Sequence, residues 1–157
     1  MTKDEFTRRI TAMTKTLYRV SYGLLRCEAD REDAVQETIL RAWQKLPTLR
    51  SEDSFQTWVV RILINQCYAI GRQRNKVVSI EDYPIPDTGQ PPETHQLRAA
   101  ILTLGEDYRL AVVLHYIEGY RIEEISDLLD IPEGTIKARL HRARGMLRHE
   151  LEEAESL

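Results

Sequence analysis

The segment from residue 134 to residue 149 has the composition of a helix that binds duplex DNA. It contains five basic residues and no acidic one. At about 100° per residue, one face is an apolar stripe of Ile136, Leu140, Ala143 and Leu147. Small or hydrogen-bonding residues face away, with cations on both flanks: Ala138, His141, Arg142 and Gly145 in the outward strip, and Lys137, Arg139, Arg144 and Arg148 beside it. In a major groove, such cations contact phosphates while the central side chains reach base edges. The alternative is an ordinary solvated basic face.

A second acid-free stretch covers residues 54–80 and combines cations with aromatic rings. Single-stranded nucleic acid is bound by this combination, because cations neutralise the backbone while unpaired bases stack on rings. The residues concerned are Phe55, Trp58, Arg61, Tyr68, Arg72, Arg74 and Lys76. For Phe55 we favour a plain core role. Asn65 is more informative, since asparagine is a mediocre residue inside a helix and usually has a solvent or ligand partner there.

The elements that position these residues are expected to be helices. Apolar residues at steps of 4, 3, 4, 3 and 4 predict one long helix, with Phe6, Ile10, Met13, Leu17, Val20 and Leu24 on its buried side. A second helix starts near Asp30 and ends before Pro47, and a third is capped by Ser54, with Phe55, Trp58, Ile62 and Ala69 as its apolar side. No window alternates with period two, so the fold class is all-α.

The C-terminal part is also predicted to be helical, over residues 97–104, 108–117 and 122–129 and in the basic segment. The turn between the last two helices is short, residues 130–134, and contains Pro132 and Gly134. Two helices joined by so short a turn, the second of them basic, predict a helix-turn-helix. A plain helical hairpin is the alternative.

Charge divides the chain into three pieces. Residues 1–76 carry 14 bases and 9 acids, residues 77–96 carry 4 acids and no base, and residues 97–157 carry 8 bases and 12 acids. The middle piece also holds four of the six prolines. It is predicted to be a flexible, extended linker between a domain at 1–76 and a domain at 97–157.

Composition excludes several classes of protein. With 42% hydrophobic and 30% charged residues, the chain is rich enough in apolar side chains to fold. No segment is long and apolar enough to insert in a membrane or to serve as a secretion signal, which predicts a cytoplasmic protein. The only two cysteines and the four histidines form no metal-ligand pattern, and no phosphate loop or nucleophile motif occurs. We therefore expect no metal, no cofactor and no enzyme activity.

Several strings of residues occur in an order typical of one family. They are Asp33-Ala34-Val35-Gln36-Glu37, Arg41-Ala42-Trp43, the spaced set Phe55, Trp58, Ile62 and Asn65, then Glu118-Gly119, Glu123-Glu124-Ile125 and the continuous string from Ile131 to Arg144. In this order they resemble the extracytoplasmic-function (ECF) sigma factors, the smallest members of the bacterial sigma-70 family. The resemblance covers nearly the whole chain except the linker.

The resemblance implies a sigma factor that directs promoter recognition, promoter melting and transcription initiation. The implied partners are core RNA polymerase, promoter DNA and an anti-sigma factor. Residues 1–76 would bind the polymerase clamp helices through Asp33, Gln36, Glu37, Leu40 and Trp43, and single-stranded DNA of the −10 element through Trp58, Arg61, Asn65, Arg72 and Arg74. Residues 97–157 would bind the −35 duplex through Thr135, Lys137, Ala138, Arg139, His141, Arg142 and Arg144. For Trp43, an ordinary amphipathic helix remains an alternative.

Three positions depart from the family pattern. Ala69 stands where an aspartate is frequent, Ala138 where a serine is common, and Arg121 where a serine usually precedes the first helix of the helix-turn-helix. The last change is expected to lose a helix cap that contributes about 1 kcal/mol.

The main alternative function is a stand-alone helix-turn-helix repressor or activator. That alternative explains residues 97–157 but leaves Asn65 and the Gln36-Glu37 pair without a role.

Overall fold

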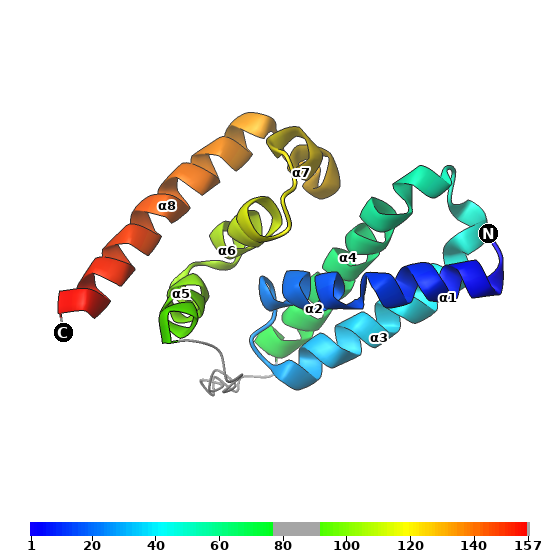
Figure 1. Cartoon of the computed structure of the whole chain (residues 1–157), viewed down its shortest axis with the longest axis horizontal. Coiled ribbons are helices and arrows are strands. Elements are labelled where there is room, and N and C mark those ends of the chain that lie inside the picture. Colours follow the sequence, from blue (N-terminus) through cyan, green and yellow to red (C-terminus); the bar gives the residue numbers. More distant parts are fainter. Residues whose placement is uncertain (77–91, 157) are drawn as a thin grey trace. The chain divides into compact units, whose positions relative to one another are not determined.

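The computed structural model describes the backbone of residues 1–76 and 92–156, and the side chains of residues 1–73 and 96–153. All regular structure in this part of the chain is helical, which confirms the predicted all-α class. The chain divides into two compact units, Met1–Ile80 and Glu81–Leu157, named here the N-terminal and the C-terminal unit (Figure 1). Residues 77–91 of the predicted linker lie outside the described residues.

The predicted first helix is in fact two helices. α1 spans Lys3–Ala12 and α2 spans Thr14–Tyr22. At Met13 the backbone leaves the α region, with φ −105° and ψ 9°, and its N–H donates to the Ile10 carbonyl at 3.1 Å. The Thr14 hydroxyl donates to the same carbonyl at 3.0 Å, a contact that bends helices. Because the break preserves the spacing, all six residues of the predicted stripe are buried.

The second helix, α3, spans Glu28–Lys45 and begins two residues before the predicted start at Asp30. The buried Arg31 side chain fixes this beginning. It donates from Nε to the Leu25 carbonyl at 2.9 Å and from Nη2 to the Arg26 carbonyl at 2.8 Å. These bonds satisfy two carbonyls of the preceding turn, and an unpaired buried carbonyl costs free energy.

The third long helix follows two short 3-10 turns; the elements are η1 (Leu46–Thr48), η2 (Glu52–Ser54) and α4 (Phe55–Lys76). Of the four residues predicted for its apolar side, Phe55 is buried, whereas Trp58, Ile62 and Ala69 are half-buried. The buried face consists of Phe55, Val59, Val60, Leu63, Ile64 and Cys67. The prediction was wrong at the other three positions because α4 packs against both α2 and α3.

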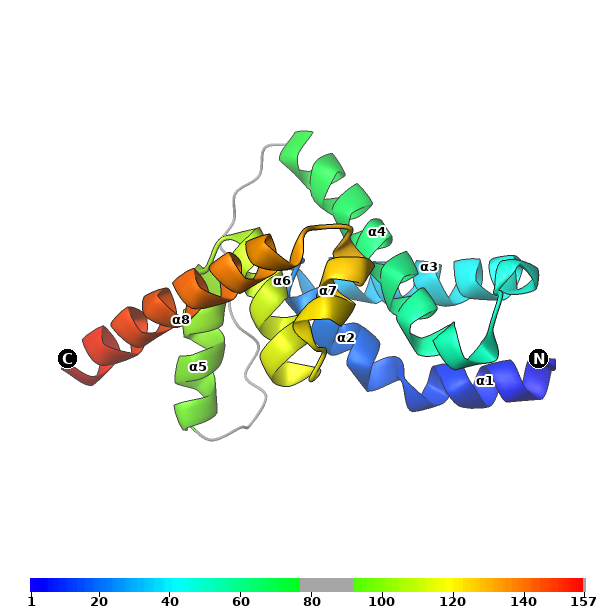
Figure 2. The same cartoon turned by 90° about the horizontal axis from the view of Figure 1, so that it is seen from above.

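The C-terminal unit consists of α5 (Pro92–Thr103), α6 (Glu106–Val112), the π-helical turn η3 (Val113–Ile117), α7 (Ile122–Leu129) and α8 (Glu133–Ser156). α8 packs against α5, α6 and α7 (Figure 2). α5 begins five residues before the predicted start at Leu97. Residues 92–96 are therefore helical rather than extended, because a proline at the first helical position loses no helix hydrogen bond.

The predicted helix over 108–117 changes to π geometry in its second half and ends at Gly119. This glycine has φ +77°, a conformation that costs an L-residue about 1–2 kcal/mol. The Tyr120 N–H then donates to the Leu114 carbonyl at 2.9 Å, and the Glu118 N–H donates to the Val113 carbonyl at 2.9 Å. Gly119 therefore sets the direction in which the chain leaves η3 toward α7.

Gly119→Ala is expected to lower the free energy of unfolding of the C-terminal unit by about 1 kcal/mol, because alanine is strained at positive φ. Gly145 provides the matched control. It lies inside α8, with open space where a Cβ would stand, so Gly145→Ala is expected to raise the same free energy by about 0.5–1 kcal/mol. Urea unfolding followed by circular dichroism compares the two variants. Equal shifts in one direction would show that backbone conformation at Gly119 has no special role.

Candidate nucleic-acid and polymerase interfaces

The basic helix α8 has the two faces that its sequence predicts. Its apolar side is buried in the C-terminal unit, with Ile136, Leu140 and Ala143 no more than 1% exposed. The predicted DNA-contacting residues lie outside this buried face: Lys137, Ala138, His141, Arg142 and Arg144 are exposed, and Thr135 and Arg139 are half-buried. One helix therefore presents four cations and a histidine outside its core contacts, with His141 and Arg142 on the outward strip and Lys137, Arg139 and Arg144 on the flanks.

The turn between α7 and α8 holds these two helices in a helix-turn-helix arrangement. Asp130 adopts the left-handed conformation, with φ 55° and ψ 50°, which aspartate tolerates better than most residues. The Ser126 hydroxyl donates to the Ile131 carbonyl at 2.6 Å, and the Ile131 N–H donates to the Ser126 carbonyl at 3.1 Å. The reciprocal pair fixes the angle at which α8 leaves the turn.

Two residues of α6 contact arginines of α8, one in its outward strip and one on the adjacent flank. The Arg142 Nη1 donates to the Tyr108 hydroxyl at 3.3 Å, and the Arg139 Nη2 lies 3.8 Å from the Asp107 carboxylate. Neither pair could be predicted from the sequence, because the partners are more than 30 residues apart and on different helices. The contacts orient Arg142 within the outward strip and Arg139 beside it.

The Arg121 departure removes a serine cap but does not leave the start of α7 without one. The Glu124 carboxylate accepts hydrogen bonds from the Arg121 backbone N–H and from its Nε, both at 3.0 Å. The backbone bond, followed by the side-chain bond, lowers the pKa of Glu124. A lowered pKa means that this contribution to stability is present above the unfolded pKa of the carboxyl and is lost as the pH falls through the folded one. The expected cost of losing the serine is therefore partly offset.

On α4, the residues predicted to bind single-stranded DNA share one side. Trp58, Arg61, Asn65 and Arg72 fall within about 60° of the helix circumference at 100° per residue. Arg61, Asn65 and Arg72 are exposed and Trp58 is half-buried. The side chain of Arg74, also predicted for this surface, lies outside the described residues. The four described residues thus lie together on the side of α4 that is opposite its buried side.

A chain of aromatic rings connects this side of α4 to α3. The ring centroids of Trp58 and Phe55 are 6.1 Å apart, those of Phe55 and Phe6 are 5.9 Å apart, and those of Phe6 and Trp43 are 5.1 Å apart. Phe55 is 3% exposed, which confirms its core role. Trp58 and Trp43 therefore lie at the two ends of a packed aromatic cluster.

The residues predicted to bind polymerase occupy one side of α3, opposite its buried residues. The set is Asp33, Gln36, Glu37, Leu40 and Trp43. Leu40 is 50% exposed and Trp43 is 43% exposed, and Glu37 pairs with Arg41 at 3.0 Å. Two large apolar side chains beside carboxylates are a suitable surface for a partner helix with basic residues.

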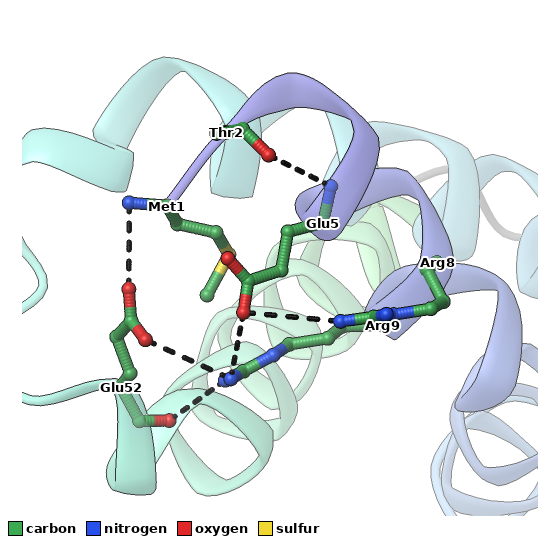
Figure 3. Close-up of polar contacts among 6 residues, drawn as sticks. All are labelled: Met1, Thr2, Glu5, Arg8, Arg9 and Glu52. Carbon is green, nitrogen blue, oxygen red and sulfur yellow. Dashed lines mark hydrogen bonds and ion pairs between the residues drawn. The ribbon is translucent and has the colours of Figure 1, made fainter.

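Arg9 fixes the turn that precedes α4 (Figure 3). Its Nη1 donates to the Glu52 carbonyl at 3.1 Å, and its Nη2 lies 3.1 Å from the Glu5 carboxylate and 3.7 Å from the Glu52 carboxylate. The guanidinium carbon also lies 5.8 Å from the centroid of the Phe55 ring. These contacts join α1 to η2 and so position the first turn of α4. Sequence reasoning did not identify them.

Each unit matches one region of a known family. Sigma-70 region 2 matches residues 10–77, and Sigma-70 region 4 matches residues 94–147. The ECF RNA polymerase sigma-E factor of Haemophilus influenzae is 31% identical, over 78% of this chain and 75% of that protein. The chain belongs to the ECF sigma factors of the sigma-70 family. The ECF RNA polymerase sigma factor SigW of Bacillus subtilis is 30% identical, over 95% of this chain and 90% of that protein.

Solved structures similar to this chain agree with its assignment to the sigma factors. The sigma factor RpoE from Bartonella quintana, solved in complex with the anti-sigma factor NepR, has a TM-score of 0.84 and 26% identity, over 94% of this chain and 97% of that chain. CnrH, solved in complex with the cytosolic domain of CnrY, shares the fold, with a TM-score of 0.73 and 21% identity over 96% and 90% of the two chains.

The family assignment gives the sigma factor its function: it directs transcription initiation by RNA polymerase and binds promoter DNA. Sigma factors are not enzymes. A stand-alone repressor accounted only for the C-terminal unit, whereas both units match sigma-70 regions. Within the described ranges, no helix is long and apolar enough to cross a membrane, and no group of three or more potential ligand side chains could hold a metal ion.

Proposed function

We propose that the two units of this sigma factor bind two different segments of one promoter, with α8 on the −35 duplex and α4 on the melted −10 strand. The observation that supports this division is the pair of cationic helix sides in separate units. α8 carries a narrow strip flanked by charges, which suits a major groove, whereas α4 combines cations with Trp58 and Asn65, which suits unpaired bases.

In the C-terminal unit, the central residues of α8 contact base edges and the flanking cations contact phosphates. Arg142 and His141 are exposed on the outward strip and have the reach and donors for purine edges. Ala138 leaves space for a base-pair edge or a thymine methyl group. The charged residues beside the strip are Lys137, Arg139 and Arg144, and Thr135 lies in the first turn of α8, where backbone N–H groups also favour a phosphate.

In the N-terminal unit, α4 captures the strand that melting releases. Asn65 is exposed and has both donors and an acceptor for an extruded base. Trp58 lies seven residues earlier on the same side and presents a half-buried ring for stacking. Arg61 and Arg72, with Arg74, supply backbone contacts. Ala69 takes the place of a carboxylate on this side, so the surface is less repulsive to phosphate.

Core polymerase binds the exposed side of α3 in this proposal. Leu40 and Trp43 provide the apolar contacts, and Asp33, Gln36 and Glu37 provide polar contacts to a basic helix. The aromatic cluster that joins Trp43 to Trp58 holds the polymerase-binding and strand-binding sides in a fixed relation within one unit. Docking on polymerase thereby also places α4.

We further propose that the protein acts in the cytoplasm, has no catalytic activity of its own and is held inactive by an anti-sigma factor. The similarity to RpoE, whose structure was solved with the anti-sigma factor NepR, supports this form of control. Co-purification from cells under non-inducing conditions tests it. Recovery of only free protein or polymerase complex would contradict it.

Run-off transcription with core RNA polymerase tests the proposed function. Genomic fragments are transcribed by core polymerase with and without this protein, and the start sites are mapped. We expect starts that depend on the protein and that share two upstream elements at constant spacing. Disruption of either element should abolish the transcript. Transcripts that depend on only one element would contradict the division between the two units.

A further inference from the structure

Tyr116 is a half-exposed tyrosine of the π-helical turn η3 whose hydroxyl contacts the basic helix. It is 50% exposed, and its Oη accepts a hydrogen bond from the Arg144 Nη1 at 2.6 Å. The two residues are 28 positions apart and come from different elements. The contact lies on a different side of α8 from the Tyr108–Arg142 contact, because residues 142 and 144 are separated by about 200° around the helix.

The hydrogen bond between Tyr116 and Arg144 leaves other hydrogen-bond donors of the two side chains unused. A guanidinium has only donors, so the Tyr116 oxygen must accept in the bond to Arg144. The hydroxyl proton of Tyr116 therefore remains available, as do the other guanidinium N–H groups of Arg144. An anion placed beside the pair would receive hydrogen bonds from both side chains, one of them charge-assisted.

The ring of Tyr116 is held in place by its neighbours. The centroids of the His115 and Tyr116 rings are 4.8 Å apart, with the planes at 72°. The His115 Nδ1 lies 2.8 Å from the Tyr120 carbonyl, and since a carbonyl only accepts, this nitrogen carries the proton. Together with the positive φ of Gly119, this bond fixes the end of η3 and reduces the freedom of the ring beside it.

We propose that Tyr116 and Arg144 form a joint binding site for one backbone phosphate of duplex DNA. In this site Tyr116 positions the guanidinium and donates its own hydroxyl proton to the same phosphate. The inference rests on the proposed binding of the −35 duplex by α8. A phosphate is favoured over a base because Arg144 lies on the flank of α8 and not in its outward strip. Holding a long side chain in advance lowers the entropy that binding costs.

We do not assign Tyr108 a direct contact with a phosphate such as the one proposed for Tyr116. It packs against the cluster of Ile101, Leu104, Val112 and Ala143 and is half-buried, and its bond to Arg142 is longer, at 3.3 Å. Its hydroxyl is therefore assigned only the orientation of Arg142.

The test uses full-length protein in complex with core polymerase. The probe is a duplex fragment that the wild-type complex selects from a pool randomised in the upstream region. Binding of the selected and of a scrambled fragment is measured over a range of salt concentrations for Tyr116→Phe, Arg144→Ala and the double variant. Tyr18→Phe, another exposed tyrosine, is the control. Unfolding midpoints verify that each variant folds.

We expect Tyr116→Phe to weaken binding of both fragments by about three- to tenfold, and Arg144→Ala to weaken both and to lower the salt dependence by about one ion. In the Arg144→Ala background, the additional loss from Tyr116→Phe should fall to about twofold or less, since the two groups share one phosphate. Tyr18→Phe should bind as the wild type does.

Two results would overturn the joint site while the proposed function stands: wild-type binding by Tyr116→Phe, or a loss that is equally large with and without Arg144. Failure of the wild-type complex to select any upstream sequence, with no loss for Arg144→Ala, would instead contradict −35 binding by α8 and the joint site with it.

Discussion

Asn65→Ala is expected to slow open-complex formation by about ten- to a hundredfold while leaving the affinity of the sigma factor for core polymerase unchanged. Melting requires an extruded base to be held outside the stack, and unstacking costs a few kcal/mol. In the proposed function, the exposed Asn65 amide on α4 offsets part of this cost with hydrogen bonds to the base edge, and a buried base edge left without partners loses about 1–3 kcal/mol. The proposed polymerase-binding side lies on α3 and is untouched by the substitution.

Permanganate footprinting of the −10 region and a polymerase pull-down measure the two effects on one preparation. Gln56→Ala is the matched control, since Gln56 is an exposed amide on the same helix that lies away from the side of Asn65. We expect wild-type thymine reactivity for the control. Full thymine reactivity in Asn65→Ala would remove the assignment of this residue to the extruded base.

Arg142→Ala is expected to cost about 1–3 kcal/mol of binding to the preferred −35 element and to reduce discrimination among variants of that element. Arg142 is exposed on the outward strip of α8, where a guanidinium can donate to O6 and N7 of a guanine. In the free protein, its Nη1 donates to the Tyr108 hydroxyl at 3.3 Å. That bond is long, so exchanging it for a base contact costs little.

Arg148→Ala supplies the comparison. Arg148 is also an exposed arginine of α8, but it lies on a flank nearly two turns further along. Its loss should weaken all upstream sequences alike, or have no effect. Transcription from a set of −35 variants by polymerase carrying each substitution separates the two roles. Equal losses on every variant for Arg142→Ala would show that this residue contacts backbone and not bases.

The sequence was sufficient to predict α8 and its two sides. Ile136, Leu140, Ala143 and Leu147 share one face at helical spacing, and the other large apolar residue of the segment, Met146, lies outside that face and is exposed. The same argument explains the six buried residues of the stripe from Phe6 to Leu24, which runs along α1 and α2. Sequence periodicity predicts the buried face of a helix where the apolar residues fit only one face.

The sequence was not sufficient where local bonds or distant partners decide the structure. The break at Met13 depends on the hydrogen bonds at the Ile10 carbonyl, which leave the apolar spacing unchanged. In α4, apolar residues surround much of the first half of the helix, so contacts with α2 and α3 selected the buried face. No spacing rule links Tyr116 to Arg144 or Tyr108 to Arg142, since these pairs form only after α6, η3 and α8 pack.

Site-specific photo-crosslinking in the polymerase complex tests the division between the two units most directly. A photoreactive residue is placed at position 58 on α4 in one variant and at position 138 on α8 in another, and the crosslinked nucleotides are mapped on a promoter fragment. We predict that position 138 crosslinks the −35 duplex whether or not the promoter is melted. Position 58 should crosslink the −10 region, and only under conditions that permit melting. Crosslinks from both positions to one element, or from position 58 to DNA that remains fully paired, would contradict the proposed division of promoter binding between the two units.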